Sequence, residues 1–365
     1  MQKELHDNRD NRGKRHDLSV VVLGFLIAIL KSTGKLNLSK IHRIMCRDYP
    51  RLMADLQQEA TTCISRSQLI RILDSFDHRS FNRLNMHYFS KQVDKDGLDW
   101  YAIDGKELRG SIDTQAGGKR GENVVFSVHH SHCQSEIIGY YSGKKESEKT
   151  IVNEYFQDKI ELSGSGFSFD ALHNGNVLLG DIAGKGGIYL AQIKKNQSIL
   201  WDDLGAIRAY AQSFHTDKTI EKGHGRIETR KVWCFPISPE CVDDRWEEAD
   251  ITSFIYLERE RIQVKTGKIS NEVVYFISNL PAIPKNGPIL FEAVRRHWRV
   301  ETNNNIRDSN FGEDKIISRK GMLQRSLAAF LNIAINRLKT INQQNNLNVV
   351  REEICEDRNL LYQLF

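Results

Sequence analysis

The sequence lacks most of the features that mark a specialised class of protein. It has six cysteines in 365 residues, but no two of them form the CxxC pair of a zinc ribbon or a thioredoxin-like site. We therefore expect free thiols in a reducing compartment. The apolar run at residues 18–30 is shorter than the roughly 20 residues that cross a bilayer, and the residues before it are highly charged. Both observations predict a soluble, cytoplasmic protein that does not enter a membrane.

Composition sets only broad limits on fold and function. Hydrophobic residues make up 40% of the chain and charged residues 27%, which is ordinary for a globular protein with a real core. The length predicts two or three domains. A net charge of +5 permits binding to nucleic acid but does not require it, because many enzymes with neutral substrates are as basic.

The order of the predicted elements divides the chain into parts. Residues 16–89 have apolar residues at helical spacing, and their basic polar faces fit either a solvated surface or a DNA-contacting module. From residue 97 the pattern predicts three strands, then helix, strand, helix, strand and helix, followed by a β-rich stretch and further helices. We therefore predict an α/β fold. It would have a ribonuclease H-like core, meaning a mixed five-stranded sheet with helices, that carries a β-rich insertion before the last catalytic helix, plus a helical N-terminal domain.

The predicted domain boundaries follow this order. They are 1–95 for the helical N-terminal domain with possible DNA binding, 96–215 for the first part of the core, 216–287 for the β-rich insertion, 288–341 for the C-terminal helices of the core, and 342–365 for a tail.

Two of the predicted strands end on an aspartate. Asp104 follows the apolar run WYAI, and Asp170 follows FSF. In the predicted element order the first and fourth strands are neighbours, so the two carboxylates would emerge side by side. Such close carboxylates repel each other unless a cation lies between them, and Mg²⁺ prefers oxygen ligands. Glu301, on a predicted helix after the β-rich insertion, is the candidate for a third acid.

Each of these acids also has an ordinary explanation. An aspartate at the end of a strand commonly caps a turn or a helix. A glutamate on a helix usually faces solvent or forms a salt bridge. The combination of the three acids in this element order makes a metal site a real alternative, but the pattern alone does not decide between the two.

Six segments carry a resemblance to a known family. They are "AIDGKELRGS", "FSFDALHN", "YLAQIKKNQ", "GHGRIETR", "RRHWRVE" and "IRDSNFGED", in this order. Together they resemble transposases of the ISAs1 insertion-sequence family, which includes the H-repeat-associated proteins and belongs to the wider group of DDE transposases. The resemblance covers nearly the whole chain, and the stretch at residues 7–30 is similar to the N-terminal domain associated with the family.

The resemblance implies a site and a reaction. The three acids of the family fall on Asp104, Asp170 and Glu301, which would hold two Mg²⁺ or Mn²⁺ ions. The enzyme would cleave and join double-stranded DNA at the terminal inverted repeats of an insertion sequence and at a target, as a homodimer in the synaptic complex. It would be a bacterial cytoplasmic protein, associated with the nucleoid when bound to DNA. Where the family reads EN and then aromatic residues, this chain has Asn-rich residues, and Asp308 is a second candidate acid that ranks below Glu301.

Basic residues near these segments are candidates for phosphate contacts. They are Lys106, Arg109, Lys194, Lys195, Arg226 and Arg230. The last two alternate with other residues on a predicted strand, so they would share one face. The ordinary alternative is a solvated loop or an exposed strand face. Contacts to phosphate would give an affinity that depends on salt rather than on base sequence.

Two other functions stay open. One is a catalytically inactive DNA-binding protein derived from such an element. The other is a ribonuclease H-fold nuclease that cuts RNA–DNA hybrids or Holliday junctions. The β-rich insertion and the helical N-terminal part favour a transposase over a nuclease of that kind.

Overall fold

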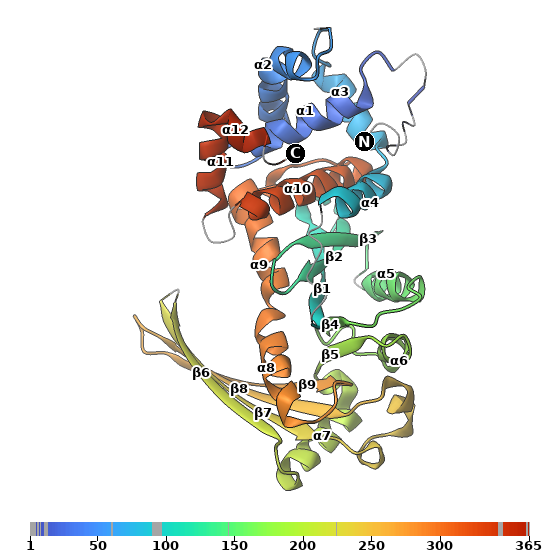
Figure 1. Ribbon diagram of the computed structural model, residues 1–365, viewed down its shortest axis with the longest axis vertical. Helices are drawn as coiled ribbons and strands as arrows, with labels where there is room; N and C mark the ends of the chain where they lie inside the picture. Colours follow the sequence, from blue (N-terminus) through green and yellow to red (C-terminus); the bar gives the residue numbers. More distant parts are fainter. Residues whose placement is uncertain are drawn as a thin grey trace.

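The computed structural model describes residues 14–59, 61–89, 97–144, 146–223, 225–341 and 346–362, together with Leu5, Asp7, Arg9, Asp10 and Leu364. A layer of helices that holds both chain termini lies at one end of the molecule, the central sheet follows, and strands of residues 215–278 form a curved β-arm at the other end (Figure 1). Among the described residues, no helix combines the length and the apolar character that a membrane crossing requires.

Nine strands of the described residues form one sheet, in the order β3-β2-β1-β4-β5-β9-β8-β7-β6. The strands are β1 (Asp99–Leu108), β2 (Glu122–His129), β3 (Ser135–Ser142), β4 (Ser165–Phe169), β5 (Ile188–Ile193), β6 (His215–Gly223), β7 (Arg226–Pro236), β8 (Ser253–Gln263) and β9 (Ile269–Ser278). β4 runs parallel to β1 and to β5, whereas the other neighbours are antiparallel. The predicted α/β class and the predicted pairing of the first and fourth strands are both confirmed.

The sheet is larger than the five strands that the sequence predicts. β9 pairs antiparallel with β5, from Leu190 opposite Ser278 to Ile193 opposite Tyr275. Without this partner, β5 would be an edge strand with unpaired backbone groups. The insertion therefore continues the central sheet instead of forming a sheet of its own, and its outer strands make the arm.

Helices cover both faces of the sheet. One face packs against α5 (Glu146–Gln157), α6 (Asn176–Gly184) and α7 (Ser198–Tyr210). The other face packs against α8 (Gly287–Arg296), α9 (Arg299–Ile306) and α10 (Gly321–Ile341). Successive residues of β1 point to opposite faces, so Ile103 belongs to the first core, whereas Ala102 packs with Val300 of α9 in the second.

The remaining helices form the layer above the sheet. They are α1 (Leu18–Leu30), α2 (Leu38–Asp55), α3 (Arg66–Ser75), α4 (His78–Phe89), α11 (Leu347–Glu356) and α12 (Arg358–Tyr362). Polar caps start several of them: the side chains of Asp17, Asn37 and Ser65 each accept a hydrogen bond from a backbone N–H in the first turn.

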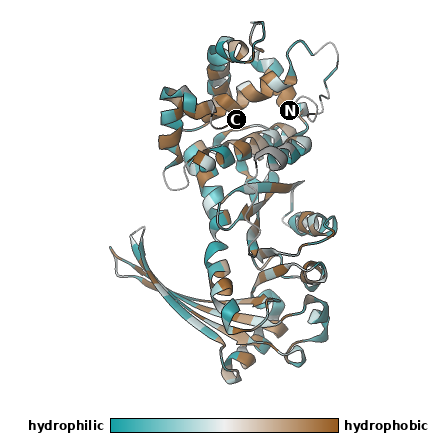
Figure 2. Cartoon of the chain, viewed as in Figure 1, coloured by the Kyte–Doolittle hydropathy of each residue, from teal (hydrophilic) through white to brown (hydrophobic). Residues whose placement is uncertain are grey.

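The apolar face of this layer is shared between distant parts of the sequence. α1 is hydrophobic on almost every side, and it is buried between α2 and α10 (Figure 2). Phe25 of α1 and Phe330 of α10 meet edge to face, with ring centroids 5.0 Å apart. The N-terminal helices thus share a core with the C-terminal ones, and the domain boundaries given above stay a prediction.

Candidate active site

Asp104 and Asp170 lie side by side at the point where the pairing of β1 with β4 ends. The prediction that Asp104 ends its strand is wrong, because β1 continues to Leu108 as the partner of β2. In the parallel pair of β1 and β4, Ile103 lies opposite Phe169, and each aspartate is the next residue along its strand. Neighbouring strands are about 4.8 Å apart, so the two backbones meet at this point. Both side chains are half-buried. The Oδ1 atom of Asp170 accepts a hydrogen bond from the backbone N–H of Leu172 at 2.8 Å, which fixes one of its oxygens.

Two contacts hold the helix that carries Glu301 along this part of the sheet. Shortly before Glu301, the Nδ1 atom of His297 lies 3.0 Å from the Oγ atom of Ser168 on β4. Shortly after it, the Oδ1 atom of Asp308 lies 3.0 Å from the Nζ atom of Lys106 on β1. Glu301 lies between these anchors and has an exposed side chain. α9 therefore follows β1 toward the edge where the two aspartates emerge.

The three predicted acids do not form a tight cluster. In the described part of the chain, they are not a group whose ligand atoms all lie within 4.8 Å of one another. A site with two ions does not need such a group, because ions about 3.5–4 Å apart take different ligands. No salt bridge among the described residues neutralises Asp170 or Glu301. The oxygen donors present are those that Mg²⁺ and Mn²⁺ prefer.

A buried glutamate that the sequence analysis did not identify packs against residues next to the two aspartates. Glu148 of α5 is 1% exposed; its Oε2 atom accepts a hydrogen bond from Tyr141 at 2.8 Å, and its Oε1 atom is 2.9 Å from the Nε2 atom of His173. A Cβ atom on Gly105 would lie 2.2 Å from Glu148 Oε2. Gly105 and His173 belong to the segments DGK and FDALHN around the two aspartates. Those motifs were the available signal.

Two buried histidines contact the hydroxyl group of Ser168 on β4, two residues before Asp170. The Oγ atom of Ser168 lies 2.9 Å from the Nε2 atom of His130 and 3.0 Å from the Nδ1 atom of His297. Burial lowers the pKa of His130 to about 2 and that of His297 to about 4. Both rings are therefore neutral near pH 7, and they contribute hydrogen bonds rather than positive charge.

Lys106 lies in a carboxylate cluster instead of at the surface. Its side chain is 6% exposed, and its Nζ atom lies 3.0 Å from Asp308, 3.0 Å from Asp314 and 3.6 Å from Glu313. Burial alone would lower the pKa of Lys106, but the carboxylates of Glu313 and Asp314 raise it above 10.5. The ammonium group is therefore charged and occupied by protein ligands.

The same cluster contains a fully buried ion pair. The guanidinium of Arg307 donates to both carboxylate oxygens of Glu313, at 2.9 and 2.6 Å. Burial opposes the ionisation of Glu313, but Arg307 and Lys106 outweigh it and hold its pKa below 4.5. Arg307 opens a π-helical turn, Arg307–Phe311, that ends the helical stretch behind Glu301. Such turns are frequent at functional sites.

Three of the six predicted basic residues stay exposed near the edge of the site. Lys194 and Lys195 follow the C-terminal end of β5, which is parallel to β4, so they lie at the edge that carries Asp170. Arg109 follows the end of β1 with a side chain that is 74% exposed, 3.9 Å from Asp314. None of the three is buried in an ion pair.

The other two basic residues lie on the β-arm. Arg226 and Arg230 share one face of β7, as their spacing predicts, and both contact Glu228, at 3.4 and 2.9 Å. Two arginines of β8 also reach this buried carboxylate, Arg259 at 3.8 Å and Arg261 at 3.4 Å. Four guanidinium groups thus surround one glutamate.

The face of the arm that carries these arginines is turned toward α8 and the start of α9. The guanidinium of Arg259 lies 4.8 Å from the centre of the Trp298 ring, next to the start of α9. On α8, Arg295 forms an ion pair with Glu221 of β6. The arm therefore presents its arginines on the α8–α9 side of the sheet.

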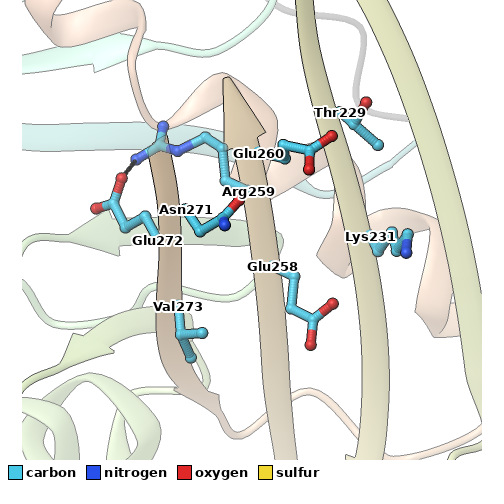
Figure 3. A pocket seen from close by; sticks show the side chains of 8 residues that line it. All are labelled: Thr229, Lys231, Glu258, Arg259, Glu260, Asn271, Glu272 and Val273. Atoms are coloured by element: carbon cyan, nitrogen blue, oxygen red, sulfur yellow. Dashed lines mark hydrogen bonds and ion pairs between the residues drawn. The ribbon is translucent and has the colours of Figure 1, made fainter. Parts of the chain in front are cut away.

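A depression of about 350 Å³ lies on the arm, lined mainly by the opposite strand faces (Figure 3). Its lining residues are Thr229, Lys231, Glu258, Arg259, Glu260, Asn271, Glu272 and Val273. Three carboxylates outnumber two basic groups there, and Figure 3 shows Arg259 turned to Glu272. This depression is poorly suited to phosphate.

Two of the relatives found by comparison with known proteins are named as putative transposases. No family model matches the chain. It is 26% identical over 278 residues to the "H repeat-associated putative transposase YhhI" of Escherichia coli strain K12, which covers 74% of the chain and 72% of the relative. It is 23% identical over 281 residues to the "Putative transposase YncI" of Escherichia coli O157:H7, covering 74% of the chain and 70% of the relative.

A third relative matches a shorter part. An "Uncharacterized protein in dhlA 3'region" of Xanthobacter autotrophicus is 29% identical over 147 residues, and the match spans about half of its length (48%) and 39% of the chain. The two longer matches confirm the resemblance that the motifs predict: the chain is a sequence relative of transposases of the H repeat-associated type.

Proposed function

We propose that the chain is a DDE transposase, which cleaves the DNA strands at the ends of an insertion sequence and joins them to a target. The observation that carries this proposal is the register of β1 and β4, in which Asp104 and Asp170 each follow the last paired residue of the two strands. The names of the relatives support a DNA-processing enzyme of this class.

We further propose that β1 to β5 are a ribonuclease H-like core. Their order is β3-β2-β1-β4-β5, with β2 antiparallel to its neighbours and with β1, β4 and β5 parallel. The helix that carries Glu301 returns to β1 after the insertion, as the proposal requires.

Asp104, Asp170 and Glu301 would hold two Mg²⁺ or Mn²⁺ ions. When bound, such ions supply charge for activating the attacking oxygen and for stabilising the leaving one. Asp170 suits this role because the Leu172 N–H orients its carboxylate without neutralising it. Asp308 ranks below Glu301 as a ligand, because its oxygen already faces Lys106.

The residues of this chain would otherwise bind and orient the DNA. Lys194, Lys195 and Arg109 are exposed at the edge of the site and would contact phosphates of the cleaved strand. The arginines of β7 and β8 would bind the phosphates of the same duplex on the α8–α9 side, which requires that some of them exchange a carboxylate for a phosphate. Lys106 is left out of this interface, because it is buried among carboxylates.

The N-terminal helices offer a second basic surface. Arg43, Arg47 and Arg51 recur at a helical spacing on α2, and all three are exposed. A helix with this stripe is suited to phosphate contacts that give affinity without base specificity. We propose that it binds the end of the element outside the cleavage site, and that the active form is a homodimer.

The test is strand cleavage of DNA that carries the inverted repeats flanking the coding region, with Mg²⁺. Asp104→Asn and Asp170→Asn should abolish cleavage and leave DNA binding intact, whereas Asp202→Asn, an exposed acid on α7, should cleave like the wild type. Asp170→Cys should be inactive in Mg²⁺ and partly active in Mn²⁺, because Mn²⁺ accepts a sulfur ligand more readily.

Three results would go against the proposal. Cleavage by Asp104→Asn at the wild-type rate would remove the proposed site. Tight binding of inverted repeats without cleavage by the wild type would favour an inactive DNA-binding derivative. Faster cleavage of RNA–DNA hybrids or four-way junctions than of inverted repeats would favour a nuclease.

The arm has a matched test of its own. Each phosphate contact that is lost should make the slope of log affinity against log salt shallower by about 0.9. Arg226→Gln should show this change. Lys231→Gln, on the opposite face of the same strand, should leave the slope unchanged. Equal slopes for the wild type and Arg226→Gln would remove this residue from the interface.

A further inference from the structure

Three potential metal ligands meet in the N-terminal helices, far from the acidic site. His42 and Cys46 lie one turn apart on α2, and Cys63 lies in the segment that leads into α3 (Figure 1). One ligand atom from each residue lies within 4.8 Å of the other two. The Sγ atom of Cys46 is 2.8 Å from that of Cys63 and 3.4 Å from the Nε2 atom of His42.

The ring of His42 is held in place by a backbone carbonyl. Its Nε2 atom lies 2.8 Å from the backbone carbonyl oxygen of Ile64. When Nε2–H donates to that carbonyl, the lone pair is on Nδ1, which lies 4.0 Å from Cys46 Sγ. Histidines that bind metals commonly donate their other N–H to a backbone carbonyl, because this fixes the tautomer and the ring.

The two segments are also held together without any ion. The hydroxyl groups of Tyr49 on α2 and Thr61 are 3.0 Å apart, so a second hydrogen bond fixes the approach of the segment that carries Cys63. The three ligand side chains are half-buried. The site is therefore preorganised, and solvent reaches it.

We propose that His42, Cys46 and Cys63 bind one soft divalent ion, best fitted by Zn²⁺, with a water molecule as the fourth ligand. Two thiolates and one imidazole are a usual ligand set for Zn²⁺. Two sulfurs on one tetrahedral zinc ion, each about 2.3 Å from it, lie about 3.8 Å apart. The thiols would therefore separate by about 1 Å on binding, which small side-chain rotations allow, and two thiol protons would pass to solvent.

Such an ion would join α2 to the start of α3. Cys63 lies just before Ser65, whose side chain caps α3. The ion would thus fix the orientation of these two helices relative to each other. The proposal does not depend on the catalytic one, because none of its ligands lies near the carboxylates.

The principal rival is a disulfide between Cys46 and Cys63. It would need the sulfurs to approach to about 2.05 Å, and it would lose one hydrogen from each thiol to an oxidant. A disulfide gives no role to His42, whereas the proposed ion uses both its lone pair and its hydrogen bond to Ile64. For this reason the geometry favours an ion.

The experiment is a titration of the full chain with Co²⁺ after chelator treatment under reducing conditions. We expect a thiolate-to-cobalt charge-transfer absorption that saturates at one ion per chain and disappears when Zn²⁺ is added. Oxygen ligands do not produce this band, so binding at the acidic site is not counted. Cys46→Ser and Cys63→Ser should lose the band, and His42→Gln should bind Zn²⁺ at least tenfold more weakly.

Cys241→Ser is the matched control, since this exposed cysteine follows β7 on the insertion side. It should keep the band and the rise in Tm that Zn²⁺ gives to the wild type. Folding of the serine variants is checked by circular dichroism, and if they do not fold, the titration of the wild type still decides. The proposal is overturned if the folded, reduced wild type gives no band, if the band survives in Cys46→Ser, or if mass spectrometry of the isolated chain finds a Cys46–Cys63 disulfide.

Discussion

The clearest consequence of the structure concerns Lys106, because its burial separates two roles that the sequence left open. Lys106→Met keeps the length and the apolar stem of the side chain and removes only the charge. Asp308 and Asp314 would then lose their buried cation, and Glu313 would keep only the guanidinium of Arg307. Removing one partner of a buried ion pair costs about 3–5 kcal/mol. The lower end applies here, because Asp308 and Asp314 still reach water.

The corresponding shift in unfolding temperature follows from the size of the chain. Unfolding entropy is about 2.1 cal/mol/K per residue, which gives roughly 0.8 kcal/mol/K for 365 residues unfolding together. A loss of about 3 kcal/mol therefore lowers Tm by about 4 °C. Scanning calorimetry near pH 7 measures the shift, with the exposed Lys194→Met as the control that should not move. Toward pH 3 the difference from the wild type should shrink, since protonated carboxylates no longer need the ammonium group.

The opposite pattern would refute this reasoning. If Lys106 contacts DNA phosphate, Lys106→Met should unfold at the wild-type temperature. Its binding to DNA should then show a slope against salt that is shallower by about 0.9. That outcome would mean that the carboxylate cluster opens in solution and that the ammonium group points outward.

Three further predictions follow from buried groups. Gly105→Ala should cost about 1–3 kcal/mol by thermal unfolding, because its Cβ would lie 2.2 Å from Glu148 Oε2; a Tm equal to that of the wild type would show that this carboxylate has room to move. The pKa of Glu313 is held below 4.5 against burial by Arg307, so the pair stabilises the fold above that pH and the contribution is lost as the pH falls; urea unfolding of the wild type and Glu313→Gln should converge toward pH 3, and a constant gap would contradict the pairing. Burial lowers the pKa of His130 to about 2, so between pH 6.5 and 2 the unfolded chain takes up a proton that the folded one excludes. Below pH 6.5 this group should therefore lower the free energy of unfolding by at most about 1.4 kcal/mol per pH unit. His130→Gln should lose that part of the pH dependence.

Much of the site region was readable along the chain. Apolar alternation and short apolar runs predict the strands of the central sheet, and a carboxylate directly after such a run is unusual in a buried strand. Asp104 and Asp170 are recognisable for this reason, and their strands are neighbours as predicted. Glu301 could be placed only by its position after the insertion and by resemblance.

Other features depend on contacts between residues that are distant in the sequence. Lys106 reads as a loop charge next to Arg109, yet it is buried because the turn after α9 brings Asp308 and Asp314 against the end of β1. Glu148 has no motif of its own. Its traces in the sequence are the residues that contact it, Gly105 beside Asp104 and His173 after Asp170.

The contact between Cys46 and Cys63 also depends on the tertiary structure. A search for CxxC pairs fails at Cys46 and Cys63 because their separation along the chain is set by the length of α2 and the loop after it. The folded chain places them in contact, and Cys46 lies one helical turn from His42. Ligand sets of this kind form between a helix and a loop, where spacing in the sequence carries little information.

The sequence by itself determined the α/β class, the order of the elements and the end of the strand before Asp170, because hydrophobic periodicity is a local property. It placed the end of β1 too early, since β1 continues past Asp104 to Leu108. Tertiary structure decided that the insertion extends the sheet through β9, that Lys106 belongs to a carboxylate cluster, and that the arginines of the arm face α8 and α9. These outcomes depend on which strand pairs with the exposed edge of β5 and on which charged side chains are buried together. Both are decided by contacts between residues that are far apart in the chain.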